Sequence, residues 1–149
     1  EEEKIPGAVE MWAANEEKNI DMLRIFDGID ELLEKLEKKG STLGVVTSRT
    51  REELELVLDQ LPIRKYFSIC ICADDTKEHK PSAQPLLKYM ELSGARKEET
   101  VYIGDSASDM ACALNAGVDC VHAVWGEPET EADATYRAGK PEQLEEIFL

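Results

Sequence analysis

Short apolar runs alternate along this chain with longer segments of amphipathic character. The apolar runs are three to seven residues long and predict strands. They cover residues 42–46, 67–72, 101–103 and 118–124, with a short edge strand at 135–137. Helices are predicted before, between and after them, over residues 10–23, 29–39, 50–61, 82–93, 106–116 and 141–149.

Periodicity and capping residues support these helices. Apolar residues recur at i, i+3, i+4 and i+7 from Ile29 to Leu36, which is the spacing of one buried helix face. Gly40 follows and is expected to end this helix. Thr50 and Glu53 have the spacing of a capping box, which predicts the start of the next helix.

Strands that alternate with helices predict an α/β fold with a parallel sheet covered by helices on both faces. In such sheets ligands bind outside the carboxyl ends of the strands. The polar residues directly after each predicted strand are therefore the first candidates for a functional site.

The composition of the chain disfavours several classes of function. The 149 residues carry a formal net charge of −15, which disfavours binding to nucleic acid or to an anionic membrane surface. No apolar run approaches the ~20 residues of a membrane span, and the opening EEEK predicts no signal peptide. The four cysteines form no CxxC motif, so we expect reduced thiols and a cytoplasmic protein; they are Cys70, Cys72, Cys112 and Cys120.

The first two predicted strands are followed by residues that suit a phosphate group. Thr47 and Ser48 come directly after the first strand, where a hydroxyl and free helix N–H groups can bind an anion. Alternatively, Ser48 and Thr50 serve only as helix caps. Lys80 lies in the segment HKPSAQP after the second strand, and taken alone it is typical of a solvated surface residue.

The stretch VYIGDSASDM ends the third predicted strand with Asp105 and continues into a helix that carries Asp109. A carboxylate at the end of a parallel strand is suited to hold a hard cation such as Mg²⁺, and Asp109 lies about one helical turn further on. The alternative is that Asp105 or Ser106 caps the helix and Asp109 stabilises its N-terminus.

Together these segments resemble the haloacid dehalogenase-like superfamily of phosphohydrolases. LGVVTSRT is similar to the second motif of that family, HKPSAQP to the third and VYIGDSASDM to the fourth. FDGIDELLEKL and AVWGEPE resemble the phosphoglycolate phosphatase subgroup, and the resemblance covers residues 25–149. It implies a parallel, Rossmann-like core sheet flanked by helices.

The resemblance also implies the chemistry. The family transfers a phosphoryl group through an aspartyl-phosphate with Mg²⁺ as cofactor, and the expected substrate is a small phosphorylated metabolite. Thr47 and the Ser48 N–H would bind the phosphoryl oxygens, and Lys80 would neutralise charge on the nucleophile and the phosphoryl group. Asp105 would ligate Mg²⁺, and Asp109 would support the metal directly or through water.

One part of the family pattern does not occur in this sequence. The nucleophile and the general acid/base lie in a DxDGT-like motif that precedes all the other motifs, and no apolar strand followed by that motif is found. Asp27 and Asp30 flank a glycine but open a helix, so we interpret them as part of the return from cap to core. We therefore expect residues 1–24 to be the remnant of a helical cap and its hinge, and residues 25–149 to be the core.

The absence of a DxDGT-like motif from these residues leads to further expectations. The 149 residues would be the carboxyl-terminal part of a longer enzyme and inactive alone. The missing central strand would leave an exposed hydrophobic edge, which favours association with the N-terminal segment or with a second copy. Alternatives are a pyrophosphatase or phosphosugar mutase of the same fold, a receiver-like signalling domain, and a pseudo-enzyme that binds partners.

Overall fold

The computed structural model describes residues 23–126 and 132–149. The predicted cap remnant, residues 1–24, lies almost entirely outside this part. In the described part the helices are α2 (Ile29–Lys38), α3 (Arg51–Leu58), α4 (Gln84–Ser93), α5 (Ala107–Ala116) and α6 (Glu142–Phe148). The strands are β1 (Gly44–Val46), β2 (Ile69–Ile71), β3 (Val101–Gly104), β4 (Asp119–Ala123) and β5 (Tyr136–Ala138). Short 3-10 turns lie at Pro62–Tyr66 (η2), Ala73–Asp75 (η3) and Lys97–Glu99 (η4).

The predicted alternation of strands and helices is confirmed, and so are its local signals. Thr50 accepts a hydrogen bond from the Glu53 N–H, and the Glu53 carboxylate accepts one from the Thr50 N–H, which completes the capping box at the start of α3. Gly40 and Gly94 follow α2 and α4 with positive φ, a conformation that glycine adopts without strain.

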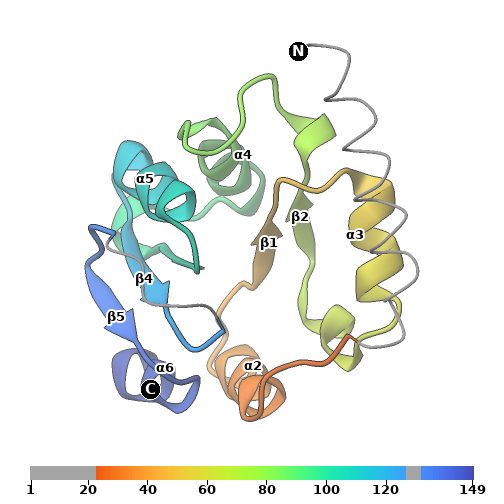
Figure 1. Cartoon of the computed structure of the whole chain (residues 1–149), viewed down its shortest axis with the longest axis vertical. Coiled ribbons are helices and arrows are strands. Elements are labelled where there is room, and N and C mark those ends of the chain that lie inside the picture. Colours follow the sequence, from red (N-terminus) through yellow and green to blue (C-terminus); the bar gives the residue numbers. More distant parts are fainter. Residues whose placement is uncertain (1–22, 127–131) are drawn as a thin grey trace.

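The strand pairing differs from the single sheet that the sequence predicts. All the pairs are parallel, but among the described residues they form two sheets, one of β1 and β2 and one in the order β3-β4-β5. In Figure 1, β1 and β2 lie apart from β4 and β5. Within residues 23–126 and 132–149 no strand pairs with both β1 and β3, so no backbone hydrogen bonds join the two sheets edge to edge.

Three clusters of buried residues hold the helices against these sheets. The largest packs α4 and α5 on one face and includes Leu86, Met110 and Cys120. The second packs α2 and α6 on the other face of β4 and β5, around Leu32 and Leu144. The third is smaller and packs α3 against β2. Both faces are therefore covered by helices, as the α/β pattern predicts.

All four cysteines are free, as predicted, and only Cys70 is partly exposed. Within the described ranges, no helix is long and apolar enough to cross a membrane.

Candidate active site

The candidate residues gather where the segments after β1, β2 and β3 meet. Thr47 directly follows β1 and Asp105 directly follows β3. Lys80 lies in the loop between η3 and α4, and Asp109 lies in the first turn of α5. Residues that are far apart in sequence thus converge at the carboxyl ends of both sheets, where ligands bind in α/β folds.

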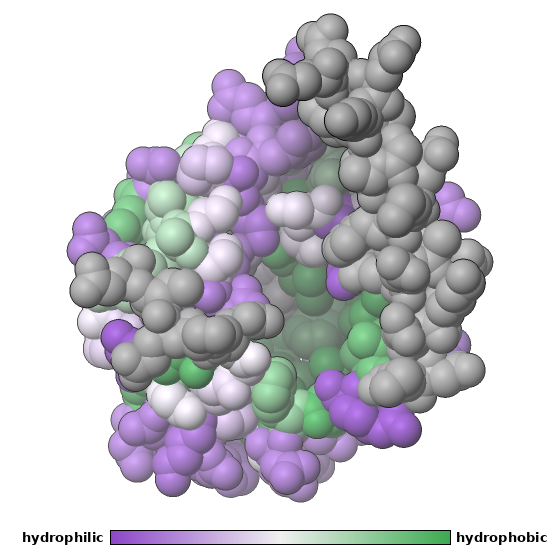
Figure 2. Space-filling model, viewed as in Figure 1, coloured by the Kyte–Doolittle hydropathy of each residue, from purple (hydrophilic) through white to green (hydrophobic). Residues whose placement is uncertain are grey.

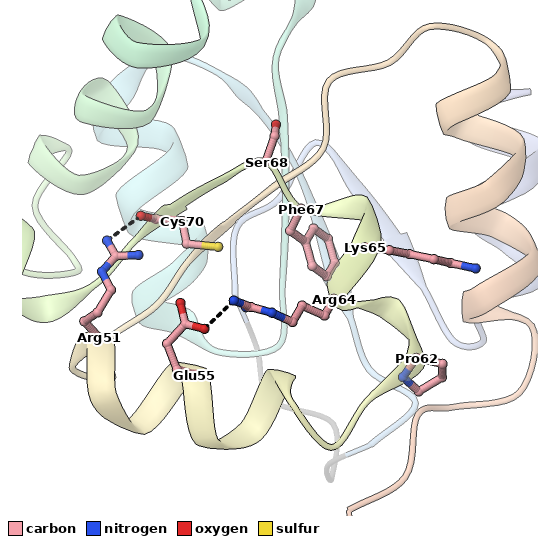
Figure 3. Close-up of a pocket in the computed structure, with 8 residues that line it drawn as sticks. All are labelled: Arg51, Glu55, Pro62, Arg64, Lys65, Phe67, Ser68 and Cys70. Carbon is pink, nitrogen blue, oxygen red and sulfur yellow. Dashed lines mark hydrogen bonds and ion pairs between the residues drawn. The ribbon is translucent and has the colours of Figure 1, made fainter.

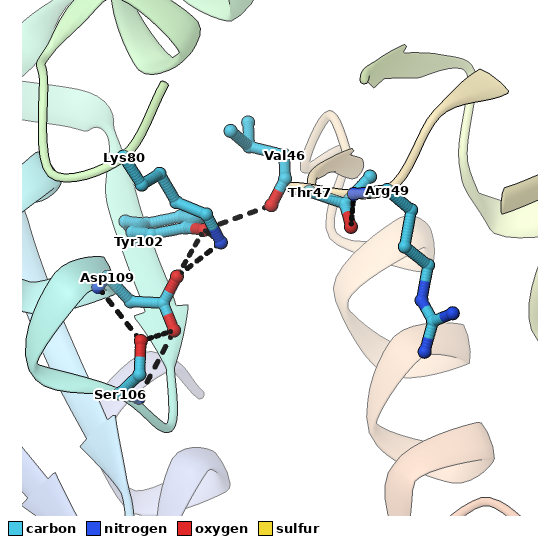
Figure 4. A network of polar contacts seen from close by, with 7 residues as sticks. All are labelled: Val46, Thr47, Arg49, Lys80, Tyr102, Ser106 and Asp109. Carbon is cyan, nitrogen blue, oxygen red and sulfur yellow. Dashed lines mark hydrogen bonds and ion pairs between the residues drawn. The ribbon is translucent and has the colours of Figure 1, made fainter. Parts of the chain in front are cut away.

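Lys80 and Asp109 form a largely buried ion pair in this region (Figure 4). The Lys80 ammonium Nζ donates to Asp109 Oδ1 at 2.6 Å, and the two side chains are only 14% and 7% exposed. The prediction from Lys80 alone, a solvated surface lysine, is therefore wrong. A buried charge needs a partner, and each of these groups supplies it for the other.

The second oxygen of Asp109 is bound by the start of its own helix. Oδ2 accepts hydrogen bonds from the Ser106 N–H at 3.2 Å and the Ser106 hydroxyl at 2.7 Å. Ser106 Oγ in turn accepts from the Asp109 N–H at 3.1 Å, so the two residues form a capping box. The alternative prediction of a helix cap is confirmed for Ser106 and Asp109, and it coexists with the ion pair.

Gly104 is required for this arrangement. A Cβ at this position would lie 2.4 Å from Asp109 Cβ and 2.7 Å from its carboxyl carbon, closer than side-chain atoms come in folded proteins. Only glycine lets α5 bring Asp109 this close to the end of β3.

Tyr102 on β3 completes the network, and the sequence reasoning missed it. Its hydroxyl donates to the Val46 carbonyl at 3.0 Å and to Asp109 Oδ1 at 3.1 Å, and Lys80 Nζ lies 3.4 Å away. One hydroxyl carries one proton, so the two acceptors share it. Tyr102 therefore links the carboxyl end of β1 to the Lys80–Asp109 pair. The only signal in the sequence was an aromatic residue in a strand, which usually indicates core packing.

Burial and hydrogen bonding act in opposite directions on this network. Burial alone would raise the pKa of Asp109, but the hydrogen bonds from Lys80 and Ser106 outweigh it, so the pKa lies below its ordinary value. Burial, reinforced by the neighbouring Asp109 carboxylate, raises the pKa of Tyr102 far above its ordinary value. The carboxylate is therefore ionised and the phenol protonated at neutral pH.

Asp105 and Thr47 lie at the border of this network. The Asp105 carboxylate is exposed at the end of β3, and the Asp105 carbonyl is 3.3 Å from Nε2 of His122, a buried residue of β4 that the sequence reasoning also missed. Thr47 Oγ1 accepts a hydrogen bond from the Arg49 N–H at 3.2 Å. Ser48 is exposed, and Figure 4 places the Arg49 side chain on the far side of Thr47 from Lys80.

The carboxylates of Asp105 and Asp109 are the candidate ligands for a hard cation such as Mg²⁺. Mg²⁺ takes oxygen ligands and keeps several waters. Asp105 offers an exposed carboxylate that fits this role. Each Asp109 oxygen already accepts two hydrogen bonds, so this residue fits a position behind the metal, through water, better than direct ligation.

Two other features lie outside this network. A cavity of about 600 Å³ lies between α3 and the segment 62–70 (Figure 3). Its arginines are already paired, since Arg64 contacts Glu55 and Arg51 contacts Asp75. Cys72, Asp74 and Asp75 lie within metal-ligating distance of one another, but both carboxylates already accept hydrogen bonds from Arg51.

Comparison with known proteins gives a consistent result. Residues 1–123 match the family model described as haloacid dehalogenase-like hydrolase. The chain is 31% identical over 111 residues to the pyrophosphatase PpaX of Bacillus mycoides, covering 74% of this chain and 52% of that protein. It is 34% identical over 103 residues to a phosphoglycolate phosphatase of Xanthomonas campestris, covering 69% and 47% respectively.

Solved structures of other proteins share the fold of this chain. A crystal structure from Lactobacillus plantarum, provisionally described as a phosphoglycolate phosphatase, superposes with a TM-score of 0.84 at 34% identity. The superposition covers 92% of this chain and 67% of the Lactobacillus plantarum chain. The chain spans about half the length of the curated relatives it matches.

Proposed function

The chain belongs to the haloacid dehalogenase-like hydrolase family, and on that basis we propose that it is the carboxyl-terminal part of a Mg²⁺-dependent phosphohydrolase. The observation that carries the proposal is the buried Lys80–Asp109 pair at the carboxyl ends of the strands, bordered by Asp105 and Thr47. Phosphoryl transfer depends mainly on positioning and on electrostatic stabilisation. This cluster fixes the Lys80 ammonium next to an acidic site that consists of Asp109 and, at its border, Asp105.

Each residue has a distinct role in the proposal. The Thr47 hydroxyl and the Ser48 N–H bind the phosphoryl oxygens. The Lys80 ammonium has three N–H donors; Asp109 takes one, and Tyr102 lies within reach of a second, which leaves a third for the substrate. Asp109 holds Lys80 in place, and Asp105 holds Mg²⁺, which supplies positive charge beside the transferred group when it is bound.

The nucleophile in this proposal is an aspartate from a DxDGT-like segment that does not occur among the 149 residues. The chain alone would then bind and position but not turn over substrate. Lys80 and the metal also explain how a chain with a formal net charge of −15 could hold an anionic substrate locally.

The substrate class is a small phosphorylated metabolite. The Xanthomonas campestris relative favours phosphoglycolate, and the Bacillus mycoides relative favours pyrophosphate as the second candidate. Both are small, doubly or more highly charged anions, so the same cationic site suits either.

A chimera tests the proposal. The chain would be joined to the N-terminal part of the Bacillus mycoides pyrophosphatase, and phosphate release from 2-phosphoglycolate and from pyrophosphate would be measured with Mg²⁺ and with EDTA. We expect Mg²⁺-dependent turnover, and a loss in kcat of about 10²-fold or more for Asp105→Asn, as for other groups that stabilise transition-state charge.

Asp119→Asn is the matched control, because Asp119 is an exposed carboxylate at the amino end of β4. It should leave turnover unchanged. Full activity of the Asp105→Asn chimera, or turnover that persists in EDTA, would contradict the proposed metal role.

A further inference from the structure

His122 is a buried histidine next to the proposed metal-binding residue Asp105. It lies on β4, which pairs with β3 on one side and with β5 on the other, and it is only 2% exposed. The β4 residues on either side of it, Val121 and Ala123, are apolar and buried. The hollow in the middle of the molecule is likewise lined mainly by hydrophobic residues (Figure 2). A polar ring in an apolar interior needs a hydrogen-bond partner, because burial takes it out of contact with water.

The contact between His122 and Asp105 shows which ring nitrogen carries a proton. Nε2 of His122 lies 3.3 Å from the main-chain carbonyl oxygen of Asp105. A carbonyl oxygen can only accept a hydrogen bond, so Nε2 must carry the proton and donate it. His122 is also the direct strand partner of Gly104, the last residue of β3. The imidazole therefore binds the backbone at the point where β3 ends and the candidate site begins.

One peptide plane connects this contact to the Lys80–Asp109 pair. The peptide bond between Asp105 and Ser106 is trans, so its C=O and its N–H point in opposite directions. His122 donates to the C=O, and the N–H donates to Asp109 Oδ2 at 3.2 Å (Figure 4). The Cα atom of Asp105 belongs to the same plane. The two hydrogen bonds together thus fix the point from which the Asp105 side chain extends.

We propose that His122 is a positioning residue that orients Asp105 for a divalent cation. This inference rests on the proposed function, in which the Asp105 carboxylate holds Mg²⁺. Asp105 is exposed, so packing does little to order it, and a backbone that is already held lowers the entropy cost of binding the cation. The support itself is rigid, because β4 is paired on both sides. Groups that orient a metal ligand in this way typically change metal affinity by about 10- to 100-fold.

Direct ligation of the cation by His122 fits less well. Mg²⁺ prefers oxygen ligands, and it keeps several of its waters when it binds to proteins. Nε2 of His122 already donates to a carbonyl oxygen, and the residue is buried, whereas the Asp105 carboxylate is exposed. His122 therefore acts on the cation only through Asp105.

The test measures cation binding by the 149-residue chain, with Mn²⁺ as the probe. Mn²⁺ shares the preference of Mg²⁺ for carboxylate, carbonyl and water oxygens. It is paramagnetic, so it broadens the NMR signals of nearby nuclei, and the backbone amide of Ser106 reports on binding next to Asp105. We expect saturable broadening of this signal in the unaltered chain and loss of that broadening in Asp105→Asn.

Two substitutions of similar length separate the hydrogen bond from packing. His122→Gln and His122→Met both remove the imidazole, but only glutamine keeps an N–H donor. The Mn²⁺ affinity should fall about 10- to 100-fold in His122→Met and less than about threefold in His122→Gln. Equal affinities of these two variants, with Asp105→Asn still defective, would overturn this inference alone. Unchanged broadening in Asp105→Asn would overturn the metal role of Asp105 in the proposed function, and this inference with it.

A second measurement needs no substitution at position 122. The chain contains two histidines, so His79→Gln leaves His122 as the single imidazole in the spectrum. Long-range ¹H–¹⁵N correlation NMR then shows which ring nitrogen carries a proton. We expect a proton on Nε2. A bare Nε2 would overturn the inference, whether or not the variants at position 122 fold, because a bare nitrogen cannot donate to the Asp105 carbonyl.

Discussion

The buried ion pair makes a sharp prediction about stability. Replacing Lys80 by methionine keeps most of the side-chain volume but removes the positive charge beside Asp109. Removing one partner of a buried pair costs about 3–5 kcal/mol, because the other charge stays in the interior. Asp109 would retain three donors, the Ser106 N–H and hydroxyl and the Tyr102 hydroxyl, so we expect the lower end, about 3 kcal/mol.

The chain contains a control with the same geometry and different burial. Lys38 Nζ also lies 2.6 Å from a carboxylate oxygen, that of Glu34, but these side chains are 70% and 51% exposed. Lys38→Met should cost less than about 1 kcal/mol, as exposed pairs generally do. The two substitutions are chemically identical, so the difference between them isolates the effect of burial.

Urea unfolding followed by far-UV circular dichroism measures both effects. With a urea dependence of about 2 kcal/mol/M, a loss of about 3 kcal/mol lowers the midpoint by roughly 1.5 M, whereas Lys38→Met should move it by less than about 0.5 M. The double variant Lys80→Met/Asp109→Asn should lose less stability than the two single variants lose together, because no buried charge is left unpaired. Equal midpoints for Lys80→Met and Lys38→Met would show that burial of the Lys80–Asp109 pair makes no difference to stability.

Three further predictions concern local structure. Thr50→Ala removes the capping box of α3 and should cost about 1 kcal/mol in the same unfolding assay; an unchanged midpoint would contradict it. Gly104→Ala places a methyl group against Asp109 and should cost about 1–3 kcal/mol, whereas Gly139→Ala, whose Cβ would meet only a flexible side chain at 3.5 Å, should change little. A thiol reagent at pH 8 should label Cys70 before the three buried cysteines, and mass spectrometry would show all four labelled only after unfolding; early labelling of any other cysteine would count against the described core.

The sequence predicts the helices well because their signals are local. Periodicity and the Thr50–Glu53 capping box act within one or two turns, and both are observed. The first two strands were predicted too long, since residues 42–46 shorten to Gly44–Val46 and residues 67–72 to Ile69–Ile71. Strands are assigned from their backbone pairing, and in the part of the chain that the structure describes β1 and β2 pair only with each other.

The candidate site was predicted in part. Two interpretations of Asp109, as a helix-capping residue and as a site residue, could not be separated from spacing alone, and the structure realises the cap together with an ion pair. Tyr102 could not be predicted, because its acceptors lie 7 and 56 residues away and its hydroxyl is polar only at the tip of an otherwise apolar side chain. Long-range pairing of this kind requires the fold.

The most direct test of the proposed function is Mg²⁺-dependent phosphate release from 2-phosphoglycolate and pyrophosphate by two samples. The first is the 149-residue chain alone, and the second is the chain mixed with the separately purified N-terminal part of the Bacillus mycoides pyrophosphatase. We expect no turnover by the first sample and turnover by the second, with loss of activity on Asp105→Asn. Mg²⁺-dependent turnover by the chain alone would contradict this expectation, because the nucleophile would then lie within these residues.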